Sequence, residues 1–275
     1  MKILIIGKNS RITQFLKEYL DKNFLISIKS YSELIKKDTL YFEKYQFIIN
    51  CSSNKKYISS KYSTSNDYDY KIAKKIIKLK TFYIFLSTRK LYKPKINCKE
   101  IDKPHPICDY SKNKLITENR LKKIVKNKLI ILRISNVIGI TKKNSKKKLH
   151  KTFIDFFFEN IKKGYIIKNQ KIFKDFISSK KLGHLISKLI KLKAIGTYNL
   201  SIGKKIYLDD IIRWLNFYNP NSFKIINQDK LNFNKDSFYL NNNKILKKTK
   251  IKMTISDLKK DCKKISKIYF LENKK

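Results

Sequence analysis

Tyr110 and Lys114 stand four residues apart in a stretch whose apolar positions recur at helical spacing. Residues at positions i and i+4 of a helix lie on one face, so the phenol and the ammonium can point into the same pocket. A free tyrosine has a pKa of about 10, and a neighbouring cation lowers it by favouring the phenolate. The pair therefore predicts a proton-transfer group for interconverting an alcohol and a carbonyl.

A serine and a threonine lie where they could complete this group. Ser87 and Thr88 end a strand-like apolar run that begins at Phe82. Either hydroxyl would hold a substrate oxygen within hydrogen-bond reach of Tyr110. The alternative is chance, because tyrosine and lysine are abundant in this chain. The interpretation therefore depends on the elements around these residues.

Apolar runs and amphipathic stretches alternate along the first half of the chain. Each run is apolar enough for a strand covered on both faces. Strands that alternate with helices predict an α/β fold with a doubly wound, Rossmann-like parallel sheet. Such a sheet binds ligands at the carboxyl ends of its strands, where Gly7, Ser87–Thr88 and Ser135–Gly139 fall. The expected strands are residues 2–6, 24–28, 47–50, 82–86 and 129–134, and the expected helices are 12–20, 68–79 and 109–125.

The second half of the chain is less regular and predicts a smaller C-terminal substrate lobe. We expect a dinucleotide-binding core over residues 1–140, completed by about 171–203. Residues 141–170 and 204–275 would form the lobe. Helical spacing occurs at 153–161, 208–217 and 255–269, and a further strand is expected at 198–202.

The formal net charge of +44 suggests a nucleic-acid partner. Only five of the 65 basic residues are arginine, however, and the lysines are spread along the whole chain. Nucleic-acid readers draw on arginine and concentrate their charge in a patch. Lysine, isoleucine and asparagine share A/T-rich codons, so a biased genome explains the composition and no nucleic-acid partner is expected. The dense cluster at 142–148 fits a solvated loop that could attract a phosphorylated ligand.

Targeting and metal signals are missing from the sequence. No apolar run approaches the roughly 18 uncharged residues that a membrane span needs, and the N-terminal run is too short for a secretory signal. We therefore expect a cytoplasmic protein. The four cysteines form no Cys-x-x-Cys pair and the three histidines have no ligand spacing, so neither a metal site nor a disulfide framework is predicted.

Several short motifs follow one another along the chain: Gly7, Ser87-Thr88 with Tyr92, Tyr110-x-x-x-Lys114, the run 132–139, the Lys-Asp-Phe-Ile stretch 174–177 and the Tyr-Asn strand within 196–203. In this order they resemble the extended short-chain dehydrogenase/reductases, the NAD-dependent epimerase/dehydratase family. The resemblance covers roughly residues 1–215. It implies NAD or NADP as the cofactor and a nucleotide-linked sugar as the substrate, and a homodimer is one assembly to consider.

The resemblance implies a role for individual residues. Thr88, four residues before Tyr92, matches the hydroxyl that orients the substrate. Tyr110 matches the proton donor and acceptor. Lys114 would lower the pKa of Tyr110 and bond the ribose of the nicotinamide nucleotide. The other cofactor-binding candidates are Gly7, Asn9, Ser10, Arg11, Ile12, Lys29, Asn50 and Ser87.

The turn after the first strand departs from the family pattern Gly-x-x-Gly-x-x-Gly. Ser10 and Thr13 stand at the second and third glycine positions after Gly7. The second glycine permits close backbone approach to the pyrophosphate, and the third lets the helix pack closely on the sheet. Dinucleotide binding could therefore be weakened. The helix N-terminus remains, and Lys8 or Arg11 could compensate electrostatically.

Two further departures bear on the cofactor and the reaction. Lys29 stands after the second strand, where an acidic residue often binds the ribose of NAD, and this favours NADP. Arg89 and Lys90 stand where the family's sugar 4,6-dehydratases carry an Asp-Glu acid/base pair, so 4,6-dehydration is not expected. Reduction of a 4-keto sugar is favoured over redox-neutral epimerisation. A catalytically inactive binding or regulatory protein with the same fold is the alternative.

Overall fold

The structure is a computed structural model and describes residues 1–140, 152–168, 172–222, 224–227 and 237–272. Its centre is a six-stranded sheet in which neighbouring strands are parallel. The predicted doubly wound, Rossmann-like sheet is confirmed. From one edge to the other, the strands are β10 (Gly196–Leu200), β5 (Leu129–Ile134), β4 (Phe82–Thr88), β3 (Phe47–Asn50), β1 (Lys2–Ile6) and β2 (Leu25–Lys29).

Side chains that alternate between two covered faces explain why these strands are apolar throughout. Ile3 and Ile5 of β1 pack in the cluster on one face of the sheet, whereas Leu4 and Ile6 pack in the cluster on the other. A central strand of such a sheet has no solvent-facing side, so polar residues are not needed at alternate positions.

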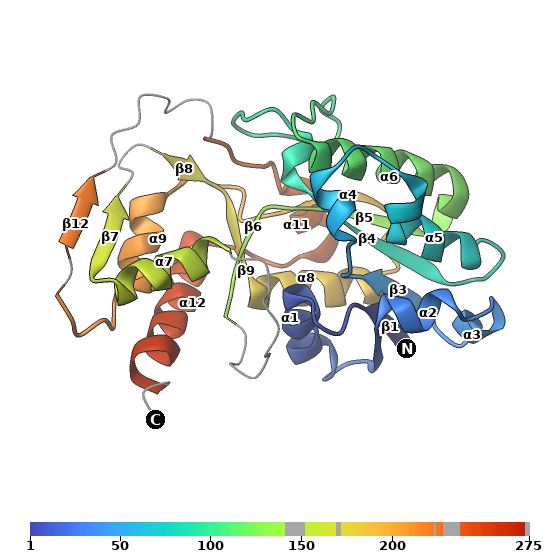
Figure 1. The fold of residues 1–275 in the computed structure, drawn as a ribbon, viewed down its shortest axis with the longest axis horizontal. Coiled ribbons are helices and arrows are strands. Elements are labelled where there is room, and N and C mark those ends of the chain that lie inside the picture. The colour runs from blue at the N-terminus through green and yellow to red at the C-terminus, as the bar shows by residue number, and fades with distance from the viewer. Residues whose placement is uncertain (141–151, 169–171, 223, 228–236, 273–275) are drawn as a thin grey trace.

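Helices cover both faces of the sheet (Figure 1). On one face, α1 (Arg11–Leu20) packs against α8 (Ser179–Lys191), where a Cβ on Gly183 would meet the Tyr19 side chain at 2.6 Å. On the other face lie α5 (Tyr68–Lys75) and α6 (Asp109–Val125). The remaining helices of this part are α2 (Tyr31–Ile35), α3 (Leu40–Glu43), α4 (Lys55–Ser59) and α11 (Asn243–Thr249), with 3-10 turns at Thr64–Asn66, Arg89–Leu91 and Lys126–Lys128.

The helix expected over residues 68–79 is shorter than predicted. It ends at Lys75, because Ile76 has left helical geometry with φ −116° and ψ 7°. The amide of Leu79 then bonds to the carbonyl of Ile76 in a turn. The chain reverses here in order to enter β4 at Phe82.

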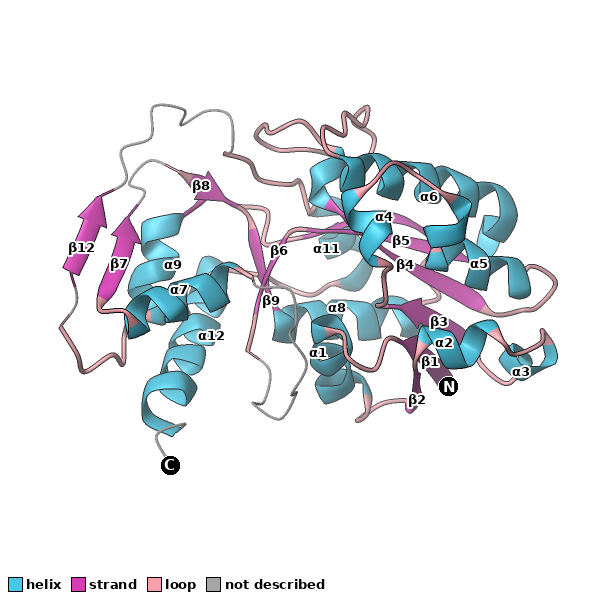
Figure 2. Cartoon of the chain, in the orientation of Figure 1, coloured by secondary structure: helices cyan, strands magenta, loops and turns pink. Residues whose placement is uncertain are grey.

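A smaller lobe lies beside the sheet (Figure 2). It contains two packed helices, α9 (Leu208–Leu215) and α12 (Ile255–Lys267), and a third helix, α7 (Phe153–Lys162), which packs on β7 (Tyr165–Lys168). A π-helical turn, Ile268–Glu272, follows α12. The other strands are β12 (Lys224–Asn227), parallel to β7; β6 (Asn136–Ile138), parallel to β9 (Phe176–Ser178); and β8 (Phe173–Lys174), antiparallel to β11 (Ile206–Tyr207).

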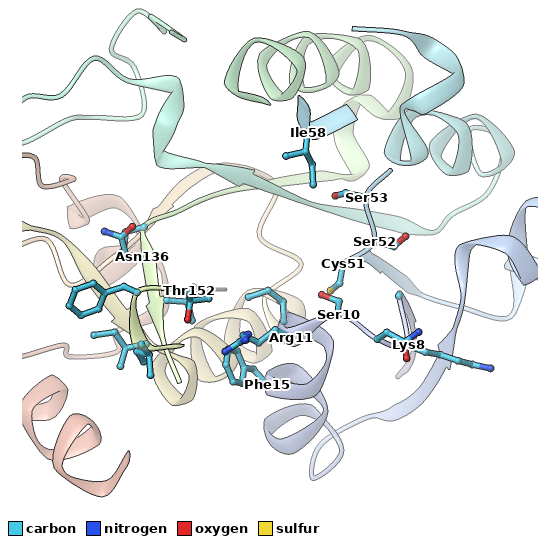
Figure 3. Close-up of a pocket in the computed structure, with 18 of the residues that line it drawn as sticks. Lys8, Ser10, Arg11, Phe15, Cys51, Ser52, Ser53, Ile58, Asn136 and Thr152 are labelled. Carbon is cyan, nitrogen blue, oxygen red and sulfur yellow. The ribbon is translucent and has the colours of Figure 1, made fainter. Parts of the chain in front are cut away.

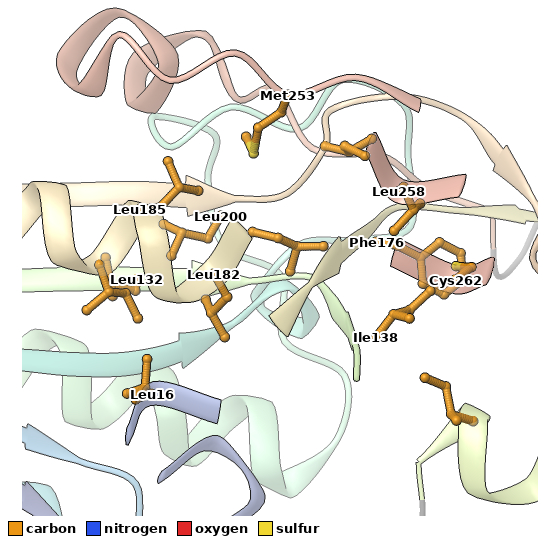
Figure 4. Packing of buried hydrophobic residues seen from close by; sticks show 14 of the residues in the cluster. Leu16, Leu132, Ile138, Phe176, Leu182, Leu185, Leu200, Met253, Leu258 and Cys262 are labelled. Carbon is orange, nitrogen blue, oxygen red and sulfur yellow. The ribbon is translucent and has the colours of Figure 1, made fainter. Parts of the chain in front are cut away.

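One hydrophobic cluster runs from the sheet into the lobe (Figure 4). Leu132 of β5 and Leu182 of α8 lie at the sheet end, and Phe176 of β9 leads to Leu258 and Cys262 of α12. Burying each such aliphatic or aromatic side chain contributes about 1.5–3 kcal/mol. The lobe therefore shares its core with the sheet. α11, from the segment expected in the lobe, packs on β10 and α8.

The described residues can be compared with the requirements for a membrane-spanning helix and for a metal site. Within the described residues, none of the helices has the length and hydropathy needed to cross a membrane. In the same ranges, no three or more His, Cys, Asp or Glu residues cluster as a metal ion would require. The lysine cluster at 142–148 and His150 lie outside the described residues.

Candidate active site

Gly7 forms the tight turn after β1. Its φ of +111° is strained for any residue with a side chain, and a Cβ would meet Ser52 Cβ at 3.0 Å. The Gly7 amide donates to the Lys29 carbonyl at 2.7 Å, and the Ser10 amide donates to the Gly7 carbonyl at 3.0 Å. Gly7 is therefore required both by its backbone conformation and by its close approach to the segment after β3.

The turn leads directly into the N-terminus of α1. Ser10 occupies the N-cap position with extended backbone geometry, but its side chain makes no capping hydrogen bond. The first amides of the helix and its dipole therefore remain available to an anion. Thr13, at the third glycine position of the family pattern, is buried, so α1 packs with a larger side chain at this point.

A cavity of about 890 Å³ lies over this turn at the carboxyl ends of the strands (Figure 3). Five predicted cofactor-binding residues line it: Gly7, Asn9, Ser10, Arg11 and Ile12. The volume is typical of a ligand pocket. The opposite walls come from the segment after β3, from Ser135 to Ile138 and from the start of α7; they include Ser52, Ser53, Ile58, Asn136 and Thr152.

The two basic side chains of the turn are already engaged. Arg11 contacts Asp155 of α7 through both carboxylate oxygens, with Nη1 3.1 Å from Oδ1 and Nη2 2.9 Å from Oδ2. Lys8 Nζ lies 2.7 Å from Glu33 Oε1 of α2. Arg11 therefore connects the sheet to the lobe across the cavity, whereas the Lys8 pair stays on the sheet side.

Lys29 is not among the residues lining this cavity, although its neighbours are. Ser30 and Tyr31 reach the cavity wall. Ser30 caps α2 in a reciprocal arrangement with Glu33, which holds this corner in place. Tyr31 stacks on Tyr68, with ring centroids 3.5 Å apart, and its buried hydroxyl oxygen has no partner in the described part of the chain. The sequence argument singled out Lys29 and missed Tyr31.

Asn50 ends β3 behind the cavity wall. It is buried, and its Oδ1 accepts the Ser52 amide at 3.0 Å. Ser52 in turn lies against Gly7. Asn50 therefore shapes the backbone that faces the turn and does not itself line the cavity.

Tyr110 lines a second cavity of about 550 Å³. Ser53 and Ile58 line both cavities, so the two cavities adjoin each other. Lys90 and Cys108 also line the second cavity. The predicted acid/base residue and the predicted cofactor turn thus lie in two adjoining cavities.

Lys114, one helical turn after Tyr110, is turned inward. It is 5% exposed, and among the described residues it lines neither cavity. Its Nζ lies 3.7 Å from Asp69 Oδ2 of α5 and 4.4 Å from the centroid of the Phe85 ring. The helical spacing brought Tyr110 and Lys114 to the same region, but the ammonium points to α5.

Thr88 and Ser87 point in different directions, as consecutive strand residues must. Thr88 is nearly buried, and its hydroxyl accepts the Lys90 amide at 3.2 Å at the start of the turn after β4. Ser87 donates to Glu118 Oε1 at 2.5 Å. Ser87 therefore joins a buried network beneath α6, away from the cavities.

That network centres on Arg133 and Glu118. Arg133 binds Glu118 at 2.8 Å and 3.2 Å, and its Nη1 donates to the Tyr92 hydroxyl at 2.8 Å. Tyr92 donates to Asn199 Oδ1 at 2.9 Å. Burial tends to lower the pKa of Arg133, but Glu118 and Tyr92 outweigh it and raise that pKa. Residues that the sequence analysis assigned to family motifs thus form hydrogen bonds that connect β4, β5, β10 and α6.

Asp175, from the Lys-Asp-Phe-Ile stretch, is a second buried anchor. Its carboxylate accepts the amides of Phe176, Gly203 and Leu240 at 2.8–3.2 Å. Burial raises its pKa to about 7, against the lowering effect of these hydrogen bonds. The residue holds the segments after β10 and before α11 onto β9.

Comparisons with known proteins place the fold. No protein-family model matches the sequence, and no curated protein does. Solved structures do match. A dTDP-4-dehydrorhamnose reductase from Clostridium acetobutylicum ATCC 824 is 18% identical with a TM-score of 0.76, over 98% of this chain and 99% of that chain.

Two further structures agree. A dTDP-4-dehydrorhamnose reductase from Bacillus anthracis str. Ames, in complex with NADP, is 16% identical with a TM-score of 0.78, over 96% of this chain and 98% of that one. A UDP-N-acetylglucosamine 4-epimerase from Methanobrevibacter ruminantium M1, in complex with UDP-N-acetylmuramic acid, is 16% identical with a TM-score of 0.77, over 98% and 97%. This chain has the fold of these nucleotide-sugar enzymes. At such identities the likeness shows the fold alone.

Proposed function

We propose that the chain is an NAD(P)-dependent oxidoreductase or epimerase of a nucleotide-linked sugar, and that it reduces a 4-keto group. The observation that carries this proposal is a pair of adjoining cavities, one over the Gly7 turn and one at Tyr110, which share Ser53 and Ile58 in their walls. A dinucleotide and a sugar that react with each other need adjoining sites of this kind at the strand ends. The structural neighbours, named for reductase and epimerase activities, support the same choice.

The turn after β1 fits a dinucleotide. The Gly7 backbone lies where a Cβ would collide with Ser52, and the amides at the start of α1 lack a side-chain cap from Ser10. A pyrophosphate would supply the missing acceptor. Gly7, Asn9, Ser10, Arg11 and Ile12 would hold it. Bound in this way, the nicotinamide would supply the hydride.

The protein's own residues would manage the proton. Tyr110 would give its phenolic proton to the carbonyl oxygen as that oxygen gains charge, and Thr88 would hold the oxygen by a hydrogen bond. Lys114 would favour the phenolate that forms. Arg89 and Lys90 cannot act as the acid/base pair of a dehydratase, so the proposal does not include 4,6-dehydration.

The cofactor's phosphate state and the compartment belong to this proposal as well. We favour NADP because a basic residue, Lys29, ends β2, and because the next two residues, Ser30 and Tyr31, put polar groups on the cavity wall. We place the reaction in the cytoplasm and consider a homodimer as the assembly.

Titration with NADPH, NADH and NAD at physiological salt tests the proposal. Micromolar binding by nicotinamide fluorescence or calorimetry is expected, with NADPH preferred. Turnover would then be followed with dTDP- and UDP-linked 4-keto sugars by loss of absorbance of the reduced cofactor. Absence of binding to all three would contradict the proposal and favour a binding or regulatory protein that has lost catalysis.

A further inference from the structure

A further cavity of about 610 Å³ lies apart from the two at Gly7 and Tyr110, and among the described residues it shares none of their lining residues. Its volume is within the range of roughly 300–1,000 Å³ that is typical of small-molecule sites. Its walls come from segments that are distant in the sequence: the loop around Asn97, the turn after β10 and the residues that lead into α11. Met253, between α11 and α12, also lines it.

The buried Asp175 carboxylate fixes two of these walls. It accepts the Gly203 amide at 3.2 Å and the Leu240 amide at 2.9 Å. Gly203 has a φ of +72°, and a Cβ at this position would meet the Asn242 side chain at 2.6 Å. The turn after β10 and the segment before α11 are therefore held against each other.

Asn97 contributes a third wall. Its φ of +58° lies in the left-handed region, which asparagine adopts more readily than most residues. Its Oδ1 accepts the Asn241 Nδ2 at 2.9 Å, and the Asn241 Oδ1 accepts the Asn243 amide at 3.0 Å. The Cys98 amide donates to the Tyr239 carbonyl at 3.1 Å, and the Cys98 carbonyl accepts the Asn241 amide at 2.7 Å. Contacts within the protein therefore hold the loop around Asn97 to the segment before α11.

Lys204 and Lys205, in the turn after β10, supply the charge of this cavity. The Lys205 Nζ lies 5.2 Å from the Phe173 ring centroid, a contact that leaves its charge uncompensated. Within the described ranges, neither lysine pairs with a carboxylate, and none of the residues that line the cavity is acidic. An anionic group that entered the cavity would therefore be attracted by two cations.

Asparagine side chains offer a second kind of contact. An amide group both donates and accepts hydrogen bonds, so it suits the hydroxyl groups of a sugar. In the described part of the chain, the Asn97 Nδ2 and the side-chain amide of Asn243 have no hydrogen-bond partner. Ile202 and Met253 add apolar surface to the same cavity, which suits the C–H face of a sugar ring.

We propose that this cavity binds the phosphate ester of a sugar. Lys204 and Lys205 would hold the phosphate, which a lysine ammonium binds as a point charge. Asn97 and Asn243 would hold the hydroxyl groups of the sugar. A free sugar phosphate and the phosphorylated ribose of a nucleotide both offer this chemistry. The cavity is separate from the proposed active site, so this inference does not depend on the proposed reaction.

Titration of the purified protein with glucose 1-phosphate, followed through the amide signals in 15N NMR, tests the proposal directly. At an ionic strength of about 0.15 M, where distant charges are screened, we expect a Kd of about 0.1–1 mM. Glucose and inorganic phosphate each offer only one of the two kinds of contact. Each should therefore bind about tenfold more weakly than glucose 1-phosphate.

Lys204→Met combined with Lys205→Met should weaken the binding of glucose 1-phosphate by about tenfold or more, because both charges at the phosphate are lost. Lys247→Met combined with Lys248→Met is the matched control. These lysines are also consecutive and exposed, but they lie on α11 and line none of the three cavities. The control lowers the net charge equally and should change the Kd less than about twofold.

Asn243→Ala is an independent variant that removes a sugar contact and no charge. It should weaken glucose 1-phosphate by about threefold to tenfold and leave the binding of inorganic phosphate unchanged. Because Asn243 is exposed, we expect this variant to fold. An equal effect on both ligands would contradict the assignment of Asn243 to the sugar.

UDP distinguishes the two sources of the ligand. If UDP binding is weakened by the Lys204 and Lys205 substitutions and glucose 1-phosphate does not bind, the cavity takes a nucleotide. Equal effects of the two lysine pairs, or inorganic phosphate that binds as tightly as glucose 1-phosphate and UDP, would indicate non-specific attraction to a basic surface and overturn the proposal. Absence of binding of both compounds at about 10 mM would overturn it as well.

Discussion

Two nitrogens of the Arg11 guanidinium contact the two oxygens of the Asp155 carboxylate, so the first residue of α1 is joined to the first turn of α7. This paired geometry is stronger and more directional than a single contact. The two side chains are 16% and 27% exposed, so water screens the pair only in part. The ion pair therefore bridges the sheet and the lobe beside the larger cavity, which Arg11 lines.

Arg11→Met should lower the free energy of unfolding by about 1 kcal/mol in urea denaturation at pH 7. Lys8→Met is the control, because the Lys8–Glu33 pair is about half exposed and should contribute nothing measurable. Equal effects in the two variants would show that the lobe does not depend on Arg11.

Lowering the pH should remove the contribution of the Arg11–Asp155 ion pair to the free energy of unfolding. Burial alone would raise the pKa of Asp155, but the Thr152 amide and hydroxyl and Arg11 together lower it below the usual 3.8. A carboxylate whose pKa is lower in the folded state contributes its full stabilisation at pH values above its pKa in the unfolded state. That stabilisation is lost as the pH falls through its pKa in the folded state. The difference between wild type and Arg11→Met should therefore hold at pH 5–7 and shrink below about pH 4.

Ser10→Gly, alone or with Thr13→Gly, tests whether side-chain bulk limits dinucleotide binding. If it does, the Kd for NADPH should fall, because the pyrophosphate can approach the backbone more closely. Ser65→Gly, in an exposed turn outside both cavities, is the control. An unchanged Kd would mean that the turn has already adapted to serine and threonine.

Tyr110→Phe should reduce kcat by about 100-fold or more, since it removes the proton but keeps the ring. The Kd for the cofactor should stay within about twofold. Tyr207→Phe, at an exposed position in the lobe, provides the comparison for loss of a tyrosine hydroxyl. Full activity in Tyr110→Phe would remove Tyr110 from the mechanism.

Arg133→Met should destabilise the protein by about 3–5 kcal/mol, because it leaves Glu118 buried without its partner. The double variant Arg133→Met with Glu118→Leu should recover much of that loss in urea denaturation. If the single variant were as stable as the wild type, the network beneath α6 would not anchor the sheet.

Local patterns predicted most of the fold. Apolar runs located the five strands before β6 within one to two residues, and helical spacing placed Tyr110 and Lys114 on α6. Gly7 could be recognised because only glycine suits a tight turn between a strand and a helix. These features depend on neighbours in the sequence.

Features that depend on distant partners were not predictable in this way. Arg11 and Asp155 are 144 positions apart, and nothing in either segment indicates the other. The direction of Lys114 depends on Asp69 and Phe85, which come from other elements. No sequence pattern indicated that Tyr31 would line the cavity, because its stacking on Tyr68 arises only when α2 and α5 come into contact.

Ser53 and Ile58 form a wall common to both cavities, and they belong to one short stretch between β3 and the end of α4. A substitution of either residue would alter the space in both cavities together. Under the proposed function, a substitution in that stretch made to fit another sugar would also alter the cofactor site. Under the proposed function, a change confined to the sugar site would have to come from the residues that line the second cavity and not the first, which are Ser59, Lys90, Cys108, Asp109 and Tyr110.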